Sequence, residues 1–146
     1  MAIEIAVLGS NDAHVLTNVA PGVFDNPIDL PATSSFLGDP RCHLVVALED
    51  GSVVAFVSAV HYVHPDKPRP ELWINEASVA PTHQGRGLGK ALMASMLDAA
   101  RKIGCGEAWV LTDRSNGPAM RLYASTGGIE SDQVMFNFHL DLQPRP

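Results

Sequence analysis

The sequence predicts a single mixed α/β domain that spans residues 1–146. Apolar runs typical of strands follow one another through the first half of the chain, and a glycine-rich stretch then leads into a strongly periodic helix. No repeat, linker or low-complexity segment divides the chain. Its apolar content of 46% and charged content of 18% fit one soluble globular domain that can bury a core.

Strands and two short helices are expected in the first half of the chain. Asp12 is a candidate N-cap for the first short helix, and residues 31–37 are expected to form the second. The dipeptide Asp50-Gly51 predicts a hairpin turn between two of the strands. The strands of this half are expected at residues 2–8, 43–49, 52–63 and 71–79.

The second half of the chain is built around one amphipathic helix. Its apolar residues recur at i, i+4 and i+8, and Gly104 and Gly106 end it. These apolar residues are Leu88, Leu92, Met93, Met96, Leu97, Ala100 and Ile103. A strand at 107–112 and a short helix capped by Ser115 or Asn116 follow. A final strand over residues 134–142 is expected from the alternation of Val134, Phe136, Phe138 and Leu140.

Composition narrows the classes of function. The net charge of −6 argues against a nucleic-acid partner and mildly favours a cationic substrate. No apolar run reaches the ~20 residues of a membrane span, and the first strand follows the initial Met without a basic leader, so a cytoplasmic enzyme is expected. Cys42 and Cys105 match no metal spacing and are interpreted as free thiols. His61 and His64 point to opposite faces of a strand, so no metal site is expected.

The stretch Gln84-Gly85-Arg86-Gly87-Leu88-Gly89-Lys90 is the strongest functional signal. It lies between a strand and a helix, where glycines let the backbone turn tightly and the N-terminal N–H groups of the helix are suited to bind a phosphate. The spacing excludes a Walker loop and the dinucleotide pattern G-x-G-x-x-G. What remains is Gln-x-x-Gly-x-Gly in a strand–loop–helix setting.

That pattern resembles the acetyl-CoA pyrophosphate loop of the GCN5-related N-acetyltransferase (GNAT) superfamily. Segments 72–79 and 116–127 are also similar to the central strand and C-terminal helix of that family. Within the superfamily the sequence is most similar to the GNAT-type aminoglycoside 3-N-acetyltransferases, through the strand at 71–79, the proline-rich turn before it and the ending at 135–141. The resemblance implies a mixed, mostly antiparallel sheet of about six or seven strands flanked by about four helices.

The resemblance also implies which residues bind acetyl-CoA. The pyrophosphate would be held by the loop backbone, with charge-assisted contacts from Arg86 and Lys90, and the pantetheine arm would pair with the central strand, which would separate from its neighbour near Val79. Asn116 is expected either to contact CoA or only to cap its helix. The full set of expected CoA-binding residues is Ala77, Ser78, Val79, Gln84, Gly85, Arg86, Gly87, Leu88, Gly89, Lys90 and Asn116.

Two residues are candidates for catalysis. Glu76 is the candidate general base, because an alkylammonium substrate must lose a proton before it can attack a thioester. Its alternatives are an anchor for a cationic substrate or a salt bridge to Arg69 or Arg121. Tyr123 is the candidate general acid for the CoA thiolate, and its alternative is an ordinary core tyrosine.

The sequence therefore predicts an acetyl-CoA-dependent N-acetyltransferase that acts on a small cationic amine, with an aminoglycoside modified at its 3-N position as the best candidate. An acidic pocket formed by segments 20–40 and 64–70 would suit such a substrate. Another small amine, a polyamine or a protein N-terminus is the first alternative, and a non-catalytic acyl-CoA sensor is the second. The alternating apolar ending also allows a homodimer through the terminal strands.

Overall fold

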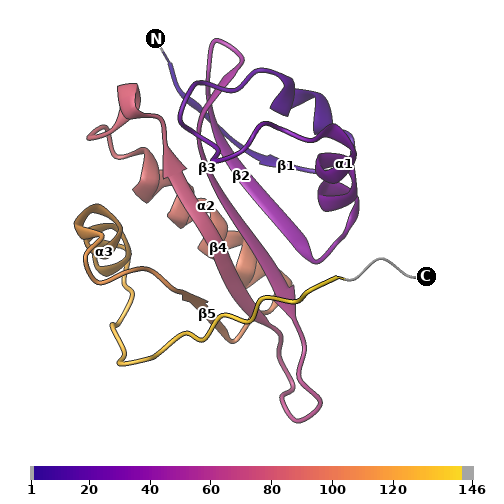
Figure 1. Cartoon of the computed structure of the whole chain (residues 1–146), viewed down its shortest axis with the longest axis vertical. Coiled ribbons are helices and arrows are strands. Elements are labelled where there is room, and N and C mark those ends of the chain that lie inside the picture. The colour runs from indigo at the N-terminus through magenta and orange to yellow at the C-terminus, as the bar shows by residue number, and fades with distance from the viewer. Residues whose placement is uncertain (1, 143–146) are drawn as a thin grey trace.

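The computed structural model describes residues 2–142, and over this range the chain forms one five-stranded sheet flanked by three α-helices and two 3-10 helices (Figure 1). The α/β fold class is confirmed. The strands are β1 (Glu4–Leu8), β2 (Cys42–Glu49), β3 (Ser52–Tyr62), β4 (Glu71–Val79) and β5 (Glu107–Val110). The helices are η1 (Ala13–Thr17), α1 (Leu30–Gly38), η2 (Pro81–His83), α2 (Leu88–Ile103) and α3 (Gly117–Ser125).

The sheet has the order β1-β2-β3-β4-β5, with the first four strands antiparallel and β5 parallel to β4. The β2–β3 hairpin turns at the expected Asp50-Gly51, where both residues have positive φ (52° and 78°). Ser58 pairs with Glu76 and Ala59 pairs with Ile74, so Asn75 is an extra residue on β4. This β-bulge reverses the side-chain alternation of β4 after Ile74.

The hydrophobic core lies on both faces of the sheet: η1 and α1 cover part of the front face, and α2 covers the rear face in Figure 1. The helix has the bounds that its period predicts, and its side chains Leu92 and Met96 are fully buried. It ends at Gly104, whose φ of 95° lies in the left-handed region that glycine adopts without strain. Helix α1 begins after Asp29, whose carboxylate accepts a hydrogen bond from the Ala32 N–H at 3.0 Å.

The predicted strand at 134–142 is wrong. These residues carry no regular secondary structure, and the apolar side chains that were expected to alternate between a buried and an exposed face are all exposed, Phe138 by 83%. Alternation alone does not make a strand, because a strand also needs a paired neighbour. Strand β5 ends at Val110, before the expected Thr112. Among the helices of residues 2–142, none is long and apolar enough to cross a membrane.

Candidate active site

A groove of about 640 Å³ follows the glycine-rich loop and passes between the end of β4 and helix α3. Most of the residues expected to bind CoA line this loop groove: Ala77, Ser78, Val79, Gln84, Gly85, Gly87, Leu88, Gly89, Lys90 and Asn116. Tyr123 lines it as well. The structure thus brings together segments that lie more than 40 positions apart in the sequence.

The loop groove is suited to bind an anion. Gly87 is the N-cap of α2 with a φ of 78°, and it has no side chain that could accept hydrogen bonds from the first turn. The positive end of the helix therefore borders the groove. Lys90, Arg121 and His83 also line it, whereas no Asp or Glu does so among the described residues.

Arg86 is the one expected loop residue that does not line the groove. Its guanidinium lies 3.8 Å from the Glu49 carboxylate, and His83 lies 3.1 Å from the same carboxylate. These contacts hold the loop against the end of β2. Gln84 lies inside the groove, where its side-chain amide donates to the Val79 carbonyl at 3.4 Å.

Strands β4 and β5 separate before the end of β4. Their pairing stops at Ile74 and Val110, although β4 continues to Val79. The separation that the resemblance implied near Val79 thus begins five residues earlier. Residues 77–79 border the groove beyond the paired region, so backbone groups on that edge of β4 are not used by β5.

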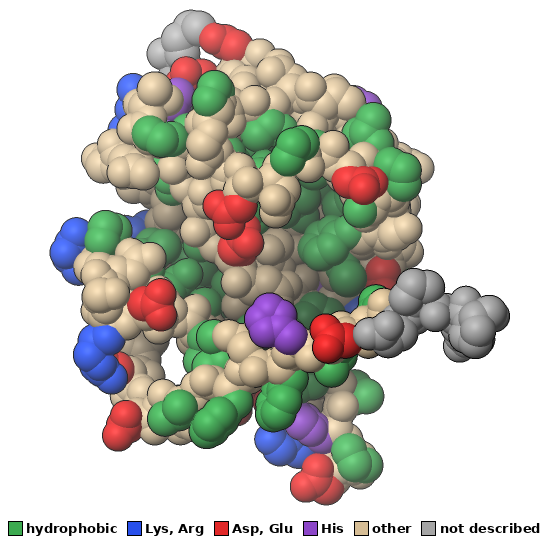
Figure 2. All heavy atoms as spheres, viewed as in Figure 1, with side chains coloured by type: hydrophobic (Ala, Val, Ile, Leu, Met, Phe, Trp, Pro, Cys, Tyr) green, Lys and Arg blue, Asp and Glu red, His purple; other side chains and the backbone are tan. Residues whose placement is uncertain are grey.

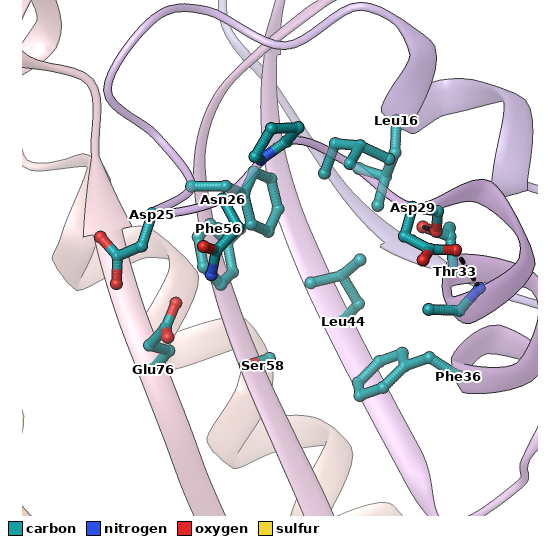
Figure 3. A pocket seen from close by; sticks show the side chains of 14 residues that line it. Leu16, Asp25, Asn26, Asp29, Thr33, Phe36, Leu44, Phe56, Ser58 and Glu76 are labelled. Atoms are coloured by element: carbon teal, nitrogen blue, oxygen red, sulfur yellow. Dashed lines mark hydrogen bonds between the residues drawn. The ribbon is translucent and has the colours of Figure 1, made fainter.

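A second cavity, of about 310 Å³, adjoins the loop groove on the face of the sheet opposite α2 (Figure 3). Strands β2, β3 and β4 form its floor through Leu44, Ser58 and Glu76, and α1 with the preceding loop forms its roof. Three of the described lining residues are carboxylates, namely Asp25, Asp29 and Glu76, and none is Lys or Arg. We call it the acidic cavity.

Glu76 and Asp25 approach each other across the acidic cavity from β4 and from the loop before α1 (Figure 3). The Glu76 side chain is open to solvent on one side, yet surrounding protein atoms displace part of its water. This burial, followed by the charge of Asp25, raises the pKa of the Glu76 carboxyl. Within residues 2–142 Glu76 makes no salt bridge, so the alternative partners Arg69 and Arg121 do not neutralise it.

Phe56 separates the two cavities. Its ring lines both of them, is only 2% exposed, and stacks on Phe24 with ring centroids 4.1 Å apart. Tyr123 faces the loop groove, and burial raises the pKa of its hydroxyl, which therefore stays protonated at neutral pH. A carboxylate thus lies on one side of Phe56 and a proton donor on the other.

Several residues of the acidic cavity were not identified from the sequence as parts of a site. Phe24, Phe56 and Ser58 carry no local signal, because ordinary core residues show the same apolar and small side chains. The expected acidic pocket is formed on one side only, since Asp25 and Asp29 line the cavity but no residue of segment 64–70 does so.

The fold and the two cavities fit a protein that transfers an acyl group. Comparison with known families gives the same class of protein. Residues 13–127 match the acetyltransferase (GNAT) family. This match covers most of the chain, so the protein belongs to the GNAT family.

Two relatives and two solved structures illustrate how similar this chain is to known proteins. The chain is 36% identical over 89 residues to the streptothricin acetyltransferase of Streptomyces lavendulae, covering 61% of this chain and 44% of that enzyme. It is 28% identical over 127 residues to the N-alpha-acetyltransferase RimI of Mycobacterium tuberculosis, covering 86% and 77%. The chain thus spans less than half the length of the streptothricin enzyme.

Among solved structures, the aminoglycoside acetyltransferase meta-AAC0020, from an uncultured soil metagenomic sample, superposes with a TM-score of 0.84 at 21% identity, covering 95% of this chain and 97% of that one. AAC(6')-Iy in complex with the bisubstrate analog CoA-S-monomethyl-acetylneamine has a TM-score of 0.78 at 19% identity, covering 96% and 99%. At these identities the similarity establishes the fold.

Proposed function

We propose that residues 1–146 form one acetyltransferase domain that transfers an acetyl group from acetyl-CoA to an amine of a small polycationic substrate. The observation that carries this proposal is the opposite charge of the two adjoining cavities. The loop groove has cations and a helix N-terminus but no described carboxylate, whereas the acidic cavity has three carboxylates and no described cation. An anionic donor and a cationic acceptor therefore fit side by side.

The residues on either side of Phe56 fit the chemistry of that transfer. The substrate ammonium loses a proton to Glu76, and its nitrogen then attacks the thioester carbonyl carbon. The carbon–sulfur bond breaks, and the hydroxyl of Tyr123 donates a proton to the departing thiolate. The attacking nitrogen then releases its second proton, which restores the Tyr123 hydroxyl. A backbone N–H at the free edge of β4, near Val79, stabilises the oxyanion.

An aminoglycoside is the acceptor that we propose. Support comes from the negative acceptor cavity, from the name of the streptothricin enzyme and from the aminoglycoside acetyltransferases that share the fold. We propose the 3-amine of the central aminocyclitol, with the 6' position named in AAC(6')-Iy as the alternative. Such an enzyme would confer resistance to its substrate. The relation to RimI makes a protein N-terminus the rival acceptor.

A thiol-release assay with acetyl-CoA and a panel of amines tests the function. The panel holds kanamycin-like and gentamicin-like aminoglycosides, streptothricin, a linear polyamine and a peptide with a free N-terminus. We expect turnover to be fastest with an aminoglycoside, and mass spectrometry of the product identifies the amine. Faster turnover of the peptide would support the rival, and no consumption of acetyl-CoA with any amine would support a sensor.

We also propose a homodimer that forms through residues 129–142. This segment exposes six large apolar side chains by more than 75%, and β5 has no strand on its outer edge within the described residues. A cytoplasmic location agrees with the two free thiols. Light scattering after size exclusion should give a dimer for the wild type and a monomer for Phe136→Ser with Phe138→Ser. A wild-type monomer would contradict the dimer.

A further inference from the structure

The bulge at Asn75 places an aromatic residue on the same face of β4 as Glu76. Trp73 pairs with Val60, which lies two positions from Ser58 on β3, so Trp73 shares the face of Ser58 and Glu76. Without the bulge, residues three apart on a strand would point to opposite faces. The face opposite α2 therefore carries Trp73 beside the acidic cavity.

Trp73 stacks on Trp109, its partner in register on β5. The ring centroids lie 5.3 Å apart and the rings are within 8° of parallel. Trp73 is 39% exposed, whereas its neighbours Leu72 and Ile74 are at most 2% exposed on the α2 side. Trp109 is half-buried, and neither tryptophan belongs to the hydrophobic core, so the core does not require this pair.

The pair is held in place by a chain of hydrogen bonds on the same side of the sheet. The indole N–H of Trp109 donates to the Tyr62 hydroxyl, and that hydroxyl donates to Glu71 at 3.2 Å. The ammonium of Lys67 donates to the other Glu71 oxygen at 2.6 Å, and this contact lowers the pKa of the Glu71 carboxyl. Fixed side chains of this kind give a binding surface that needs little ordering when a ligand arrives.

We propose that Trp73 and Trp109 form a second acceptor subsite, which binds a distal ring or ammonium group of a polyamino substrate while the reacting amine lies at Glu76. This inference rests on the proposed function and adds a determinant of specificity to it. Three residues along a strand span roughly 10 Å, which suits two linked amino-sugar rings. An ammonium group over an indole is attracted by the ring quadrupole, and tryptophan is the best side chain for this contact.

Figure 2 shows that the face opposite α2 carries acidic side chains near its centre, beside hydrophobic ones. In the view of Figure 1, residues 129–142 pass in front of β5 and then in front of β4 and β3. The competing explanation for the stacked tryptophans is that they pack against this segment and do not contact a ligand. It predicts that substitutions at Trp73 change stability without changing the choice between substrates.

Intrinsic fluorescence provides a direct test, because Trp73 and Trp109 are the two tryptophans of the chain. Titration with neamine, a two-ring polyamine, should change the emission saturably, and glucosamine, with one ring and one amine, should change it much less. The titration needs no acetyl-CoA, so it gives a result even if no amine is acetylated. Equal responses to the two ligands, or no response to neamine, would overturn the subsite.

Kinetics of Trp73→Leu supply the second readout. The ratio of kcat/KM for neamine to that for glucosamine should fall about 2- to 30-fold, and Trp73→Phe should recover part of the loss. The matched control is Leu111→Ala, which truncates an apolar residue of similar exposure (42%) just beyond β5 and should leave the ratio unchanged. A ratio that stays constant in Trp73→Leu, with only a lower melting temperature, would support the packing explanation.

Discussion

The substitution Gly87→Asp should weaken CoA binding while leaving the protein folded. Gly87 has a φ of 78°, and a Cβ built on it meets no atom within 4 Å. The cost to folding is then the left-handed backbone alone, about 1–2 kcal/mol. For a chain of this size that corresponds to a fall in Tm of about 2–8 °C. A carboxylate roughly 5 Å from a bound phosphate adds about 1–3 kcal/mol of repulsion, a loss in affinity of about 5- to 150-fold.

Gly51→Asp is the matched control for this prediction. Gly51 also has a φ of 78° and no atom within 4 Å of its Cβ, but it lies in the β2–β3 turn and does not line the loop groove. Both variants should lose similar stability in thermal unfolding followed by circular dichroism. Calorimetric titration with CoA should show the loss of affinity in Gly87→Asp alone. Equal CoA affinity in the two variants would refute the phosphate-binding role of the loop.

Three further predictions concern the acidic cavity and the core. Glu76→Gln should lower kcat by one to three orders of magnitude, because the amide cannot take the substrate proton; wild-type turnover would remove the assignment. Asp25→Asn should move the acid limb of the pH–rate profile to lower pH, because the Asp25 charge raises the pKa of Glu76 and the base must be ionised; a shift to higher pH would contradict this. Leu92→Ala, at a fully buried position of α2, should cost about 2–5 kcal/mol in thermal unfolding, and Ile103→Ala, at the exposed end of the helix, should cost less.

The loop groove could be predicted from the sequence because its determinants are local. Gly87 is needed for a positive φ, and the apolar period of α2 fixes the helix that follows. Asn116 caps α3 as expected, accepting from the Ala119 N–H at 3.2 Å. Each of these features is contained in a few consecutive residues, so a short pattern is sufficient.

The acidic cavity could not be predicted in the same way. Its residues come from η1, from the loop before α1, from α1 itself and from three strands, and their meeting depends on how these elements pack. The alternation at 134–142 was misleading for a related reason. A pattern of period two reports which side chains share a face, but the pairing partner that would make the segment a strand is not encoded nearby.

The bulge on β4 explains how one strand serves the core, the acidic cavity and the aromatic pair. If strict alternation continued from Leu72 and Ile74, Glu76 would point toward α2 and lie unpaired in the core, where burial of a charge is costly. The extra residue Asn75 turns Glu76 to the opposite face, which it then shares with Trp73. In the sequence, the bulge lies where the two polar residues Asn75 and Glu76 follow the apolar run 72–74. Asn75 therefore keeps the charge of Glu76 out of the core and brings Glu76 and Trp73 to one surface.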